Sequence, residues 1–305
     1  MKVNEDTRNI LCKLPTFLKE RIENIPEPCI EELEEIRINC GFDTILIAGG
    51  KEFVLDDGEM MNSEVVEELL NKILDYSYYA HEDDLSNGFI TIEGGHRVGI
   101  CGRVTLKDGN VHLIKDISSL NIRRSREIKG VSDKIISSIV DSGNNYIGNT
   151  LIISPPKCGK TTLLRDVARS LSNKGFRVSI CDERSEIAGS YNGKYSYDLG
   201  NRTEVLDGCP KSKGIIMLIR AMSPDVIITD EIGKPEDVHA IEEALSAGVK
   251  VITSIHGSSY EDILFSPIGK VIENGFFDTL IFLSAYPQTG SIKKIMKLGG
   301  FKKGA

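Results

Sequence analysis

Two short stretches of the chain carry residue types suited to chemistry on phosphate groups: Lys160-Thr161 and Asp230-Glu231. An ammonium group neutralises phosphate charge, and hydroxyl and carboxylate oxygens are ligands that Mg²⁺ accepts. A second carboxylate next to the first can orient and deprotonate an attacking water molecule. These types in this order predict a site for Mg²⁺ and a nucleoside triphosphate.

The stretch from Leu151 to Thr162 contains the elements that would position Lys160. A short apolar run is followed by a loop, by Gly-Lys-Thr and by an amphipathic helical pattern. This is the layout of a phosphate-binding P-loop, where unpaired N–H groups at a helix N-terminus favour an anion. The alternative is a plain strand-to-helix turn. The expected nucleotide contacts are Ser154, Pro155, Pro156, Lys157, Cys158, Gly159, Lys160, Thr161 and Thr162.

One feature of this loop departs from the usual pattern. The pattern opens with Gly, whereas this chain has Ser154 at that place, followed by two prolines that lack N–H groups. The donors to a phosphate must therefore come mainly from Lys157 onward. Thr161 is the expected hydroxyl ligand of Mg²⁺.

An apolar run that ends in two carboxylates lies downstream, at Asp225–Glu231. In a P-loop protein the first carboxylate, Asp230, would hold Mg²⁺ through water, and Glu231 would activate the attacking water. Alone, this run favours a strand followed by a charged turn. The P-loop upstream makes the catalytic interpretation the stronger one.

Two further polar segments follow predicted strands. Cys181–Glu186 contains Glu183 and Glu186, which are expected to position Mg²⁺ or water; a solvent-facing charged loop is the alternative. Thr253 and His256 end the strand that follows Asp230-Glu231. His256 is a candidate sensor of the terminal phosphate, although a single His is more often structural.

Composition limits the classes of protein that the chain can belong to. It has 305 residues, 40% of them hydrophobic, which suggests two domains. The net charge of −8 disfavours broad nucleic-acid binding. Seven irregularly spaced Cys favour reduced thiols in a reducing compartment. No signal peptide and no apolar run of about 20 residues is evident, so we expect a cytoplasmic protein that reaches membranes through a partner.

The patterns predict an α/β protein with two domains. Residues 1–125 read as helices followed by short antiparallel strands, an N-terminal α+β domain; within them a helix is expected to begin at Pro28 and to include Glu31, Glu32, Glu34 and Glu35. Residues 126–305 alternate strands and helices, which predicts a mainly parallel sheet covered on both faces, with ligands at the carboxyl ends of the strands. Gly189–Gly208 reads as a loop and Tyr260–Ile272 as a helix. Lys115–Arg126 is either a solvated linker or a source of arginines for a phosphate.

These segments, in their order, resemble the Walker A, Asp box, Walker B and His box of the secretion and pilus-motor ATPases. The Ser-Pro-Pro opening, Asn201–Lys211, Met222–Gly233 and Ser254–Ser258 are similar to one sporulation branch of that superfamily, the stage III sporulation AA family of endospore-forming bacteria. Ile-Gly-Lys follows Glu231, where secretion ATPases have Ile-Arg-Asp.

The resemblance implies a RecA-like P-loop ATPase domain, ATP and Mg²⁺ as cofactors, and a homo-oligomer, a hexameric ring motor. It implies that arginines of the N-terminal domain reach the terminal phosphate; the matching positions are Arg97 and Arg123, with Arg103 as a third candidate. It further implies service to a membrane-embedded sporulation channel, on the mother-cell side of the forespore membrane.

Two other functions remain open. A RecA-like ATPase that handles nucleic acid would need a basic channel and would bind in a salt-sensitive manner, which the acidic composition disfavours. A nucleotide-dependent scaffold that does not turn ATP over would not need Glu231.

Overall fold

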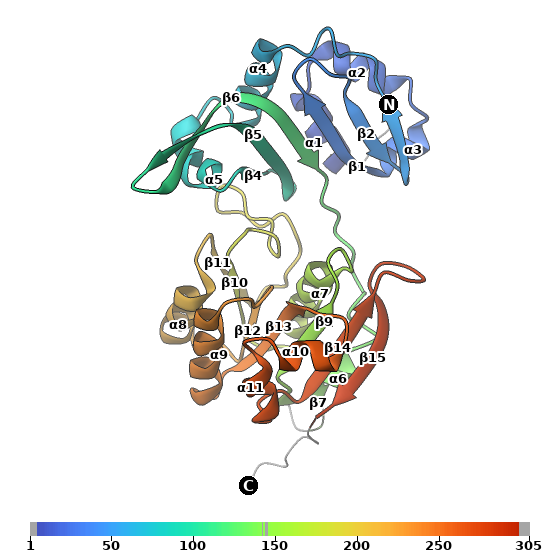
Figure 1. Ribbon diagram of the computed structural model, residues 1–305. Helices are drawn as coiled ribbons and strands as arrows, with labels where there is room; N and C mark the ends of the chain where they lie inside the picture. Colours follow the sequence, from blue (N-terminus) through green and yellow to red (C-terminus); the bar gives the residue numbers. More distant parts are fainter. Residues whose placement is uncertain (1–4, 142, 144–145, 299–305) are drawn as a thin grey trace. The chain divides into compact units, whose positions relative to one another are not determined.

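The computed structural model describes residues 5–141, 143 and 146–298 and divides them into two units. Unit 1 comprises residues 5–126 together with 189–196, and unit 2 comprises the remaining described residues (Figure 1). The ends of the predicted domains, residues 1–4 and 299–305, lie outside the described residues. Among the residues that are described, no helix is both long and apolar enough to cross a membrane.

Unit 1 is built on a six-stranded sheet in which every neighbouring pair is antiparallel, in the order β3-β2-β1-β6-β5-β4. Its strands are β1 Leu33–Asn39, β2 Ile45–Ala48, β3 Lys51–Val54, β4 Phe89–Ile92, β5 His96–Lys107 and β6 Asn110–Arg123. Its helices are α1 Glu5–Lys13, α2 Thr16–Glu23, α3 Glu27–Glu31, α4 Ser63–Ile73, the 3₁₀ helix η1 Tyr78–His81 and α5 Glu82–Ser86.

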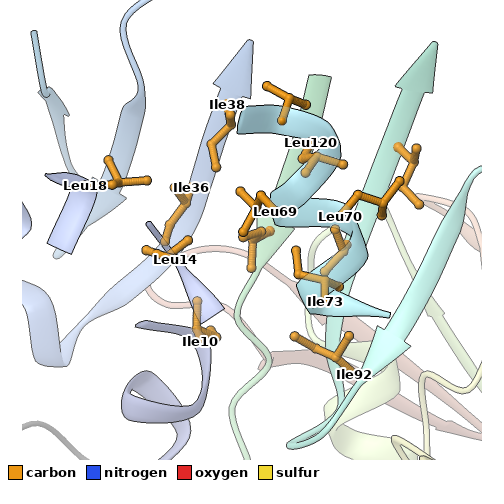
Figure 2. Close-up of a cluster of buried hydrophobic side chains, with 14 of the residues drawn as sticks. Ile10, Leu14, Leu18, Ile36, Ile38, Leu69, Leu70, Ile73, Ile92 and Leu120 are labelled. Atoms are coloured by element: carbon orange, nitrogen blue, oxygen red, sulfur yellow. The ribbon is translucent and has the colours of Figure 1, made fainter. Parts of the chain in front are cut away.

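Helices cover one face of this sheet, and their apolar side chains form a single core with it. Ile36 of β1 and Leu120 of β6 are buried against Leu69 of α4, and Ile10 of α1 joins the same cluster (Figure 2). Side chains alternate between the two faces along each strand. Residues next in sequence to the core residues, such as Arg97 and Arg123, therefore lie on the other face. The core therefore fixes which face of the sheet carries the arginines.

Unit 2 contains a seven-stranded sheet in the order β11-β10-β12-β13-β9-β14-β15. Its strands are β9 Thr150–Ser154, β10 Val178–Asp182, β11 Thr203–Asp207, β12 Val226–Thr229, β13 Lys250–His256, β14 Thr279–Ser284 and β15 Ser291–Lys297. Its helices are α6 Ile136–Ile139, α7 Lys160–Asn173, α8 Lys211–Met222, α9 Pro235–Ser246, α10 Tyr260–Leu264 and α11 Gly269–Glu273, and β7 Val140–Asp141 pairs with β8 Tyr146–Ile147.

All neighbours in the large sheet are parallel except β14 and β15, and helices cover both faces. Ile152 of β9 packs in one core cluster with Leu164 of α7, whereas Leu151 and Ile153 pack in another with Ile241 of α9. β9 is consequently buried along its whole length. The predicted α/β class with a mainly parallel sheet is confirmed.

Two segments of unit 1 differ from expectation. The helix that begins near Pro28 ends at Glu31, and β1 follows from Leu33. The register of β1 shifts between Leu33 and Glu35, and both Leu33 and Ile36 are buried. Of the two alternatives for Lys115–Arg126, the solvated linker does not hold for residues 115–123, because they form the second half of β6, which pairs with both β1 and β5.

Two segments of the C-terminal half also differ from expectation. The loop at Gly189–Gly208 contains β11 and sends residues 189–196 into unit 1, where the Tyr191 hydroxyl donates to Asp75 at 2.9 Å. The expected helix at Tyr260–Ile272 is two short helices, because Pro267 cannot donate the hydrogen bond that would join α10 to α11.

Candidate active site

The loop between β9 and α7 forms the base of the candidate site. Gly159 makes the turn into α7, since its φ of 80° lies in the left-handed region that side chains disfavour. No side chain of the N-cap residue Gly159 caps α7 by a hydrogen bond, so the N–H groups of its first turn are suited to an anion. The predicted contacts lie together between the end of β9 and this first turn: Ser154, Pro155, Pro156, Lys157, Cys158, Gly159, Lys160, Thr161 and Thr162.

The ammonium of Lys160 is buried among acceptors. Nζ lies 3.0 Å from the carbonyl oxygen of Ser154, 3.2 Å from its Oγ, 3.1 Å from the carbonyl oxygen of Pro155 and 2.9 Å from Nδ1 of His256. Burial lowers the pKa of Lys160, and the charge of Glu231 opposes this shift. The hydroxyl of Ser154 thus contacts the ammonium of the P-loop lysine. The usual P-loop pattern, which has Gly at this position, did not predict this contact.

His256 links Lys160 to Glu231. Its Nε2 lies 2.9 Å from Oε1 of Glu231, while its Nδ1 faces the ammonium. Because an ammonium can only donate, Nδ1 must accept, and the ring proton is left on Nε2 to donate to the carboxylate. A continuous chain of polar contacts therefore connects the phosphate-binding lysine with the predicted base.

The backbone holds Glu231 in an unusual conformation. Its φ of 34° is positive, which costs a residue with a Cβ about 1–2 kcal/mol. The Glu231 N–H donates to Oγ of Ser254 at 3.0 Å, and the Ile232 N–H donates to the Ser254 carbonyl at 2.8 Å. β13 thus fixes the turn that directs Glu231, and strain of this kind is typical of functional sites.

Strand order explains why these residues meet. β13 lies between β9 and β12, with His256 opposite Ser154 and Thr253 opposite Thr229. The polar end of β13 is therefore inserted between the P-loop and the Asp230-Glu231 turn. The Oγ1 of Thr253 is buried and has no hydrogen-bond partner in the part of the chain that the structure describes. The structure brings Lys160, His256, Glu231 and Asp230 to one edge of the sheet.

Asp230 and Glu183 share a lysine that the sequence did not single out. Nζ of Lys211 lies 2.6 Å from Oε2 of Glu183 and 3.5 Å from Oδ1 of Asp230. Burial raises the pKa of Asp230, against the effect of Lys211. Burial would also raise the pKa of Glu183, but its hydrogen bond to Lys211 lowers it below the usual value.

Asp182 organises the segment that carries Glu186. Its carboxylate accepts the N–H groups of Glu186, Ile187 and Ala188 at 2.9, 2.9 and 2.8 Å. Arg165 donates to the carbonyls of Glu186 and Ile187 from the other side. Burial raises the pKa of Asp182 to about 7, although these N–H groups oppose the shift. Glu186 is close enough to Asp230 to raise the pKa of that carboxyl.

Replacement of Asp182 should loosen this segment. In Asp182→Ala three N–H groups lose their acceptor, which we expect to lower the free energy of unfolding by about 2–4 kcal/mol, since each unsatisfied buried donor is costly. Hydrogen exchange at Ile187 and Ala188 should accelerate at least about thirtyfold. Asp182→Asn keeps an acceptor oxygen and should show a smaller change; equal protection in wild type and Asp182→Ala would contradict the assignment.

The candidate arginines belong to unit 1. Arg97 and Arg123 are register partners on β5 and β6, and the guanidinium of Arg97 lies 3.5 Å from the centre of the Phe89 ring. Arg123 is exposed. Nε of Arg103 lies 2.8 Å from Asp116, so this side chain is engaged in an ion pair.

The residues present fit a magnesium ion that arrives with phosphates. Within the described part of the chain, no group of three or more His, Cys, Asp or Glu is arranged to hold a metal ion. Mg²⁺ usually takes one or two protein oxygens and completes its shell with substrate phosphates and water. The carboxylate of Asp230 and the hydroxyl of Thr161 at the start of α7 are suited to such an ion. The buried Oδ1 of Asp230 has no hydrogen-bond partner among the described residues.

Comparison with protein families and curated proteins gives related matches. The family model described as "Sporulation stage III, protein AA" matches residues 4–302. Stage III sporulation protein AA of Bacillus subtilis (strain 168) is 41% identical over 294 residues, which cover 94% of each protein. The Arabidopsis thaliana protein SEEDLING PLASTID DEVELOPMENT 1 is 26% identical over 84% of this chain, and the match covers 34% of its own length.

Solved structures with a similar fold include a pilus retraction motor and an ATPase. The pilus retraction motor PilT with bound ADP has a TM-score of 0.59 at 14% identity, over 92% of this chain and 81% of that chain. The Legionella pneumophila ATPase DotB has a TM-score of 0.54 at 18% identity, over 88% and 76%. The chain thus has the fold of RecA-like secretion ATPases.

Proposed function

Because the chain belongs to the sporulation stage III, protein AA family, we propose that it hydrolyses ATP to ADP and phosphate with Mg²⁺. We propose further that it works as a hexameric ring motor. This motor energises or assembles a membrane-embedded, secretion-like channel complex during endospore formation.

The chain of contacts from Lys160 through His256 to Glu231 supports this proposal most strongly. A P-loop lysine can be structural and a carboxylate pair can be a charged turn, but their connection through a histidine at 2.9 Å on both sides has no structural requirement. Asp230, next to Glu231, adds the carboxylate that Mg²⁺ would need. Together these groups match the needs of phosphoryl transfer to water.

Each residue then has a defined task. Lys160 exchanges its carbonyl acceptors for the phosphate oxygens, and in doing so it leaves Nδ1 of His256. Glu231 orients the water and accepts its proton. Mg²⁺, when bound, neutralises charge on the phosphates. The contact of His256 with both Lys160 and Glu231 couples phosphate binding to the readiness of the base.

Ring assembly and docking are proposed from the resemblance. The arginines of unit 1 are proposed to act in the assembled ring. Arg123, with Arg97 beside it, is proposed to supply positive charge to the terminal phosphate in the assembled ring. Such a group can be worth about 10³–10⁵ in rate. Docking is proposed to occur through membrane proteins of the sporulation channel, on the mother-cell side of the forespore membrane, with the protein in the cytoplasm.

Phosphate release by purified protein tests this proposal. We expect Mg²⁺-dependent ATP turnover that rises with protein concentration, together with oligomers in native mass spectrometry with a non-hydrolysable ATP analogue. Arg123→Ala should preserve ATP affinity and reduce turnover by about 10³. Lys107→Ala, at the exposed end of β5, is the matched control and should turn over ATP like the wild type.

Other outcomes would change the conclusion. A monomer that binds single-stranded DNA tightly in low salt would favour the nucleic-acid-handling alternative. Binding of ATP without release of phosphate would favour the scaffold. Turnover that is unaffected in Arg123→Ala would remove this arginine from the proposed role.

A further inference from the structure

Lys211 is a buried cation that the proposed reaction does not yet use. It is 5% exposed and is the first residue of α8. Its Nζ contacts Glu183, which follows β10, and Asp230, which follows β12. Since β10 and β12 are neighbouring parallel strands, the ammonium joins the ends of two strands to the start of a helix.

This position is unfavourable for a lysine on local grounds. The N-terminus of a helix carries partial positive charge, so an ammonium in the first turn is repelled. Removal of an ammonium from water costs several kcal/mol unless carboxylates compensate for it. A residue that violates local preferences in this way is expected where the site requires it.

Asp230 is the residue whose side chain requires a lysine at this position. Its Oδ1 is buried and accepts no hydrogen bond from any described residue, and the Lys211 ammonium lies 3.5 Å away. Glu183 contacts the same ammonium at the shorter distance of 2.6 Å. Glu183 therefore anchors Lys211, and Lys211 faces the carboxylate of Asp230 from inside the protein.

We propose that Lys211 is a positioning residue for magnesium: it orients the carboxylate of Asp230 so that the ion delivered with ATP is held there. The inference rests on the proposed function. It adds a residue from the segment Asn201–Lys211, and it makes Glu183 the anchor of that residue rather than a group that contacts the ion.

Binding of Mn²⁺, followed by electron paramagnetic resonance in the presence of a non-hydrolysable ATP analogue, tests this role. Lys211→Met should weaken Mn²⁺ binding about 10–100-fold, the usual loss when the partner of a ligating carboxylate is removed. Nucleotide affinity in excess chelator should stay within about twofold, because the P-loop is intact. Lys211→Arg, which keeps the charge, should recover most of the Mn²⁺ affinity.

Measurements of Tm and of Mn²⁺ affinity separate a positioning role of Lys211 from a role in charge balance alone. Lys211→Met leaves two carboxylates without their cation and should lower Tm, whereas Lys211→Met/Glu183→Gln should restore Tm but not Mn²⁺ affinity. If Lys211→Met does not fold, the Mn²⁺ affinity of the double variant tests the proposal. Turnover of either variant should rise toward the wild-type value with added Mg²⁺. The substitutions should therefore change the KM for the ion and not kcat.

Three results would overturn the inference. Mn²⁺ binding by Lys211→Met that equals or exceeds that of the wild type would show that the ammonium only balances charge. Wild-type Mn²⁺ affinity in the double variant would show the same. Failure of the wild-type protein itself to bind Mn²⁺ with the ATP analogue would refute the proposed function, and this inference with it. The first two results would overturn only the inference about Lys211.

Discussion

Lys160→Ala should lose ATP binding, by at least about thirtyfold in the dissociation constant. The ammonium is buried at the start of α7, and a contact between a buried charge and phosphate is worth about 2–5 kcal/mol when one partner is truncated. Each 1.4 kcal/mol is a factor of ten in affinity. Isothermal titration with an ATP analogue and Mg²⁺ measures the loss directly.

The fold should survive this substitution. The acceptors around Lys160 are carbonyl and hydroxyl oxygens and a histidine nitrogen, and the cost of burying the ammonium disappears with the side chain. Lys174→Ala is the matched control, because Lys174 caps the opposite end of the same helix in an exposed position. Wild-type ATP affinity in Lys160→Ala would exclude the loop as the phosphate site.

Glu231→Gln should trap bound ATP, with kcat reduced about 10²–10⁴-fold, the range for loss of a positioned base. The amide keeps an acceptor oxygen for Nε2 of His256, so the contact at 2.9 Å can persist without the negative charge. ATP affinity should therefore stay within a few-fold of the wild type. Single-turnover cleavage of labelled ATP, measured with the amount of nucleotide bound, separates binding from chemistry.

The control for this variant is Glu236→Gln, in the exposed first turn of α9. It removes the same charge from a nearby position and should leave turnover unchanged. If Glu231→Gln cleaves bound ATP as fast as the wild type, Glu231 is not the base. The ion pair of Arg184 with Glu231, 3.4 Å long and exposed, should contribute little to either result.

These two variants probe the two ends of one connected group. Lys160 and Glu231 both contact His256, and the charge of Glu231 raises the pKa of Lys160 against the effect of burial. Their effects on turnover should therefore be less than additive in the double variant, as for residues that act as a unit. Residues that share a partner seldom contribute independent free energies.

The sequence alone determined the elements that depend on short-range patterns. The apolar run within Asp225–Glu231 forms β12, Val226–Thr229, and Gly-Lys-Thr stands at the start of α7, as the P-loop layout predicts. Alternating strands and helices were sufficient for the mainly parallel sheet, because burial on both faces requires continuous apolar strands. Asp230 and Glu231 could be proposed from their place directly after such a strand.

Tertiary structure decided what depends on pairing between distant segments. Pro28 and the acidic residues after it suggested a continuing helix, and only pairing with β2 and β6 makes Leu33–Asn39 a strand. The position of β13 between β9 and β12 placed His256 between Lys160 and Glu231, and the packing of α8 brought Lys211 to Glu183 and Asp230. Local patterns report which side of an element is buried, whereas strand order and helix packing arise from contacts between segments far apart in the chain.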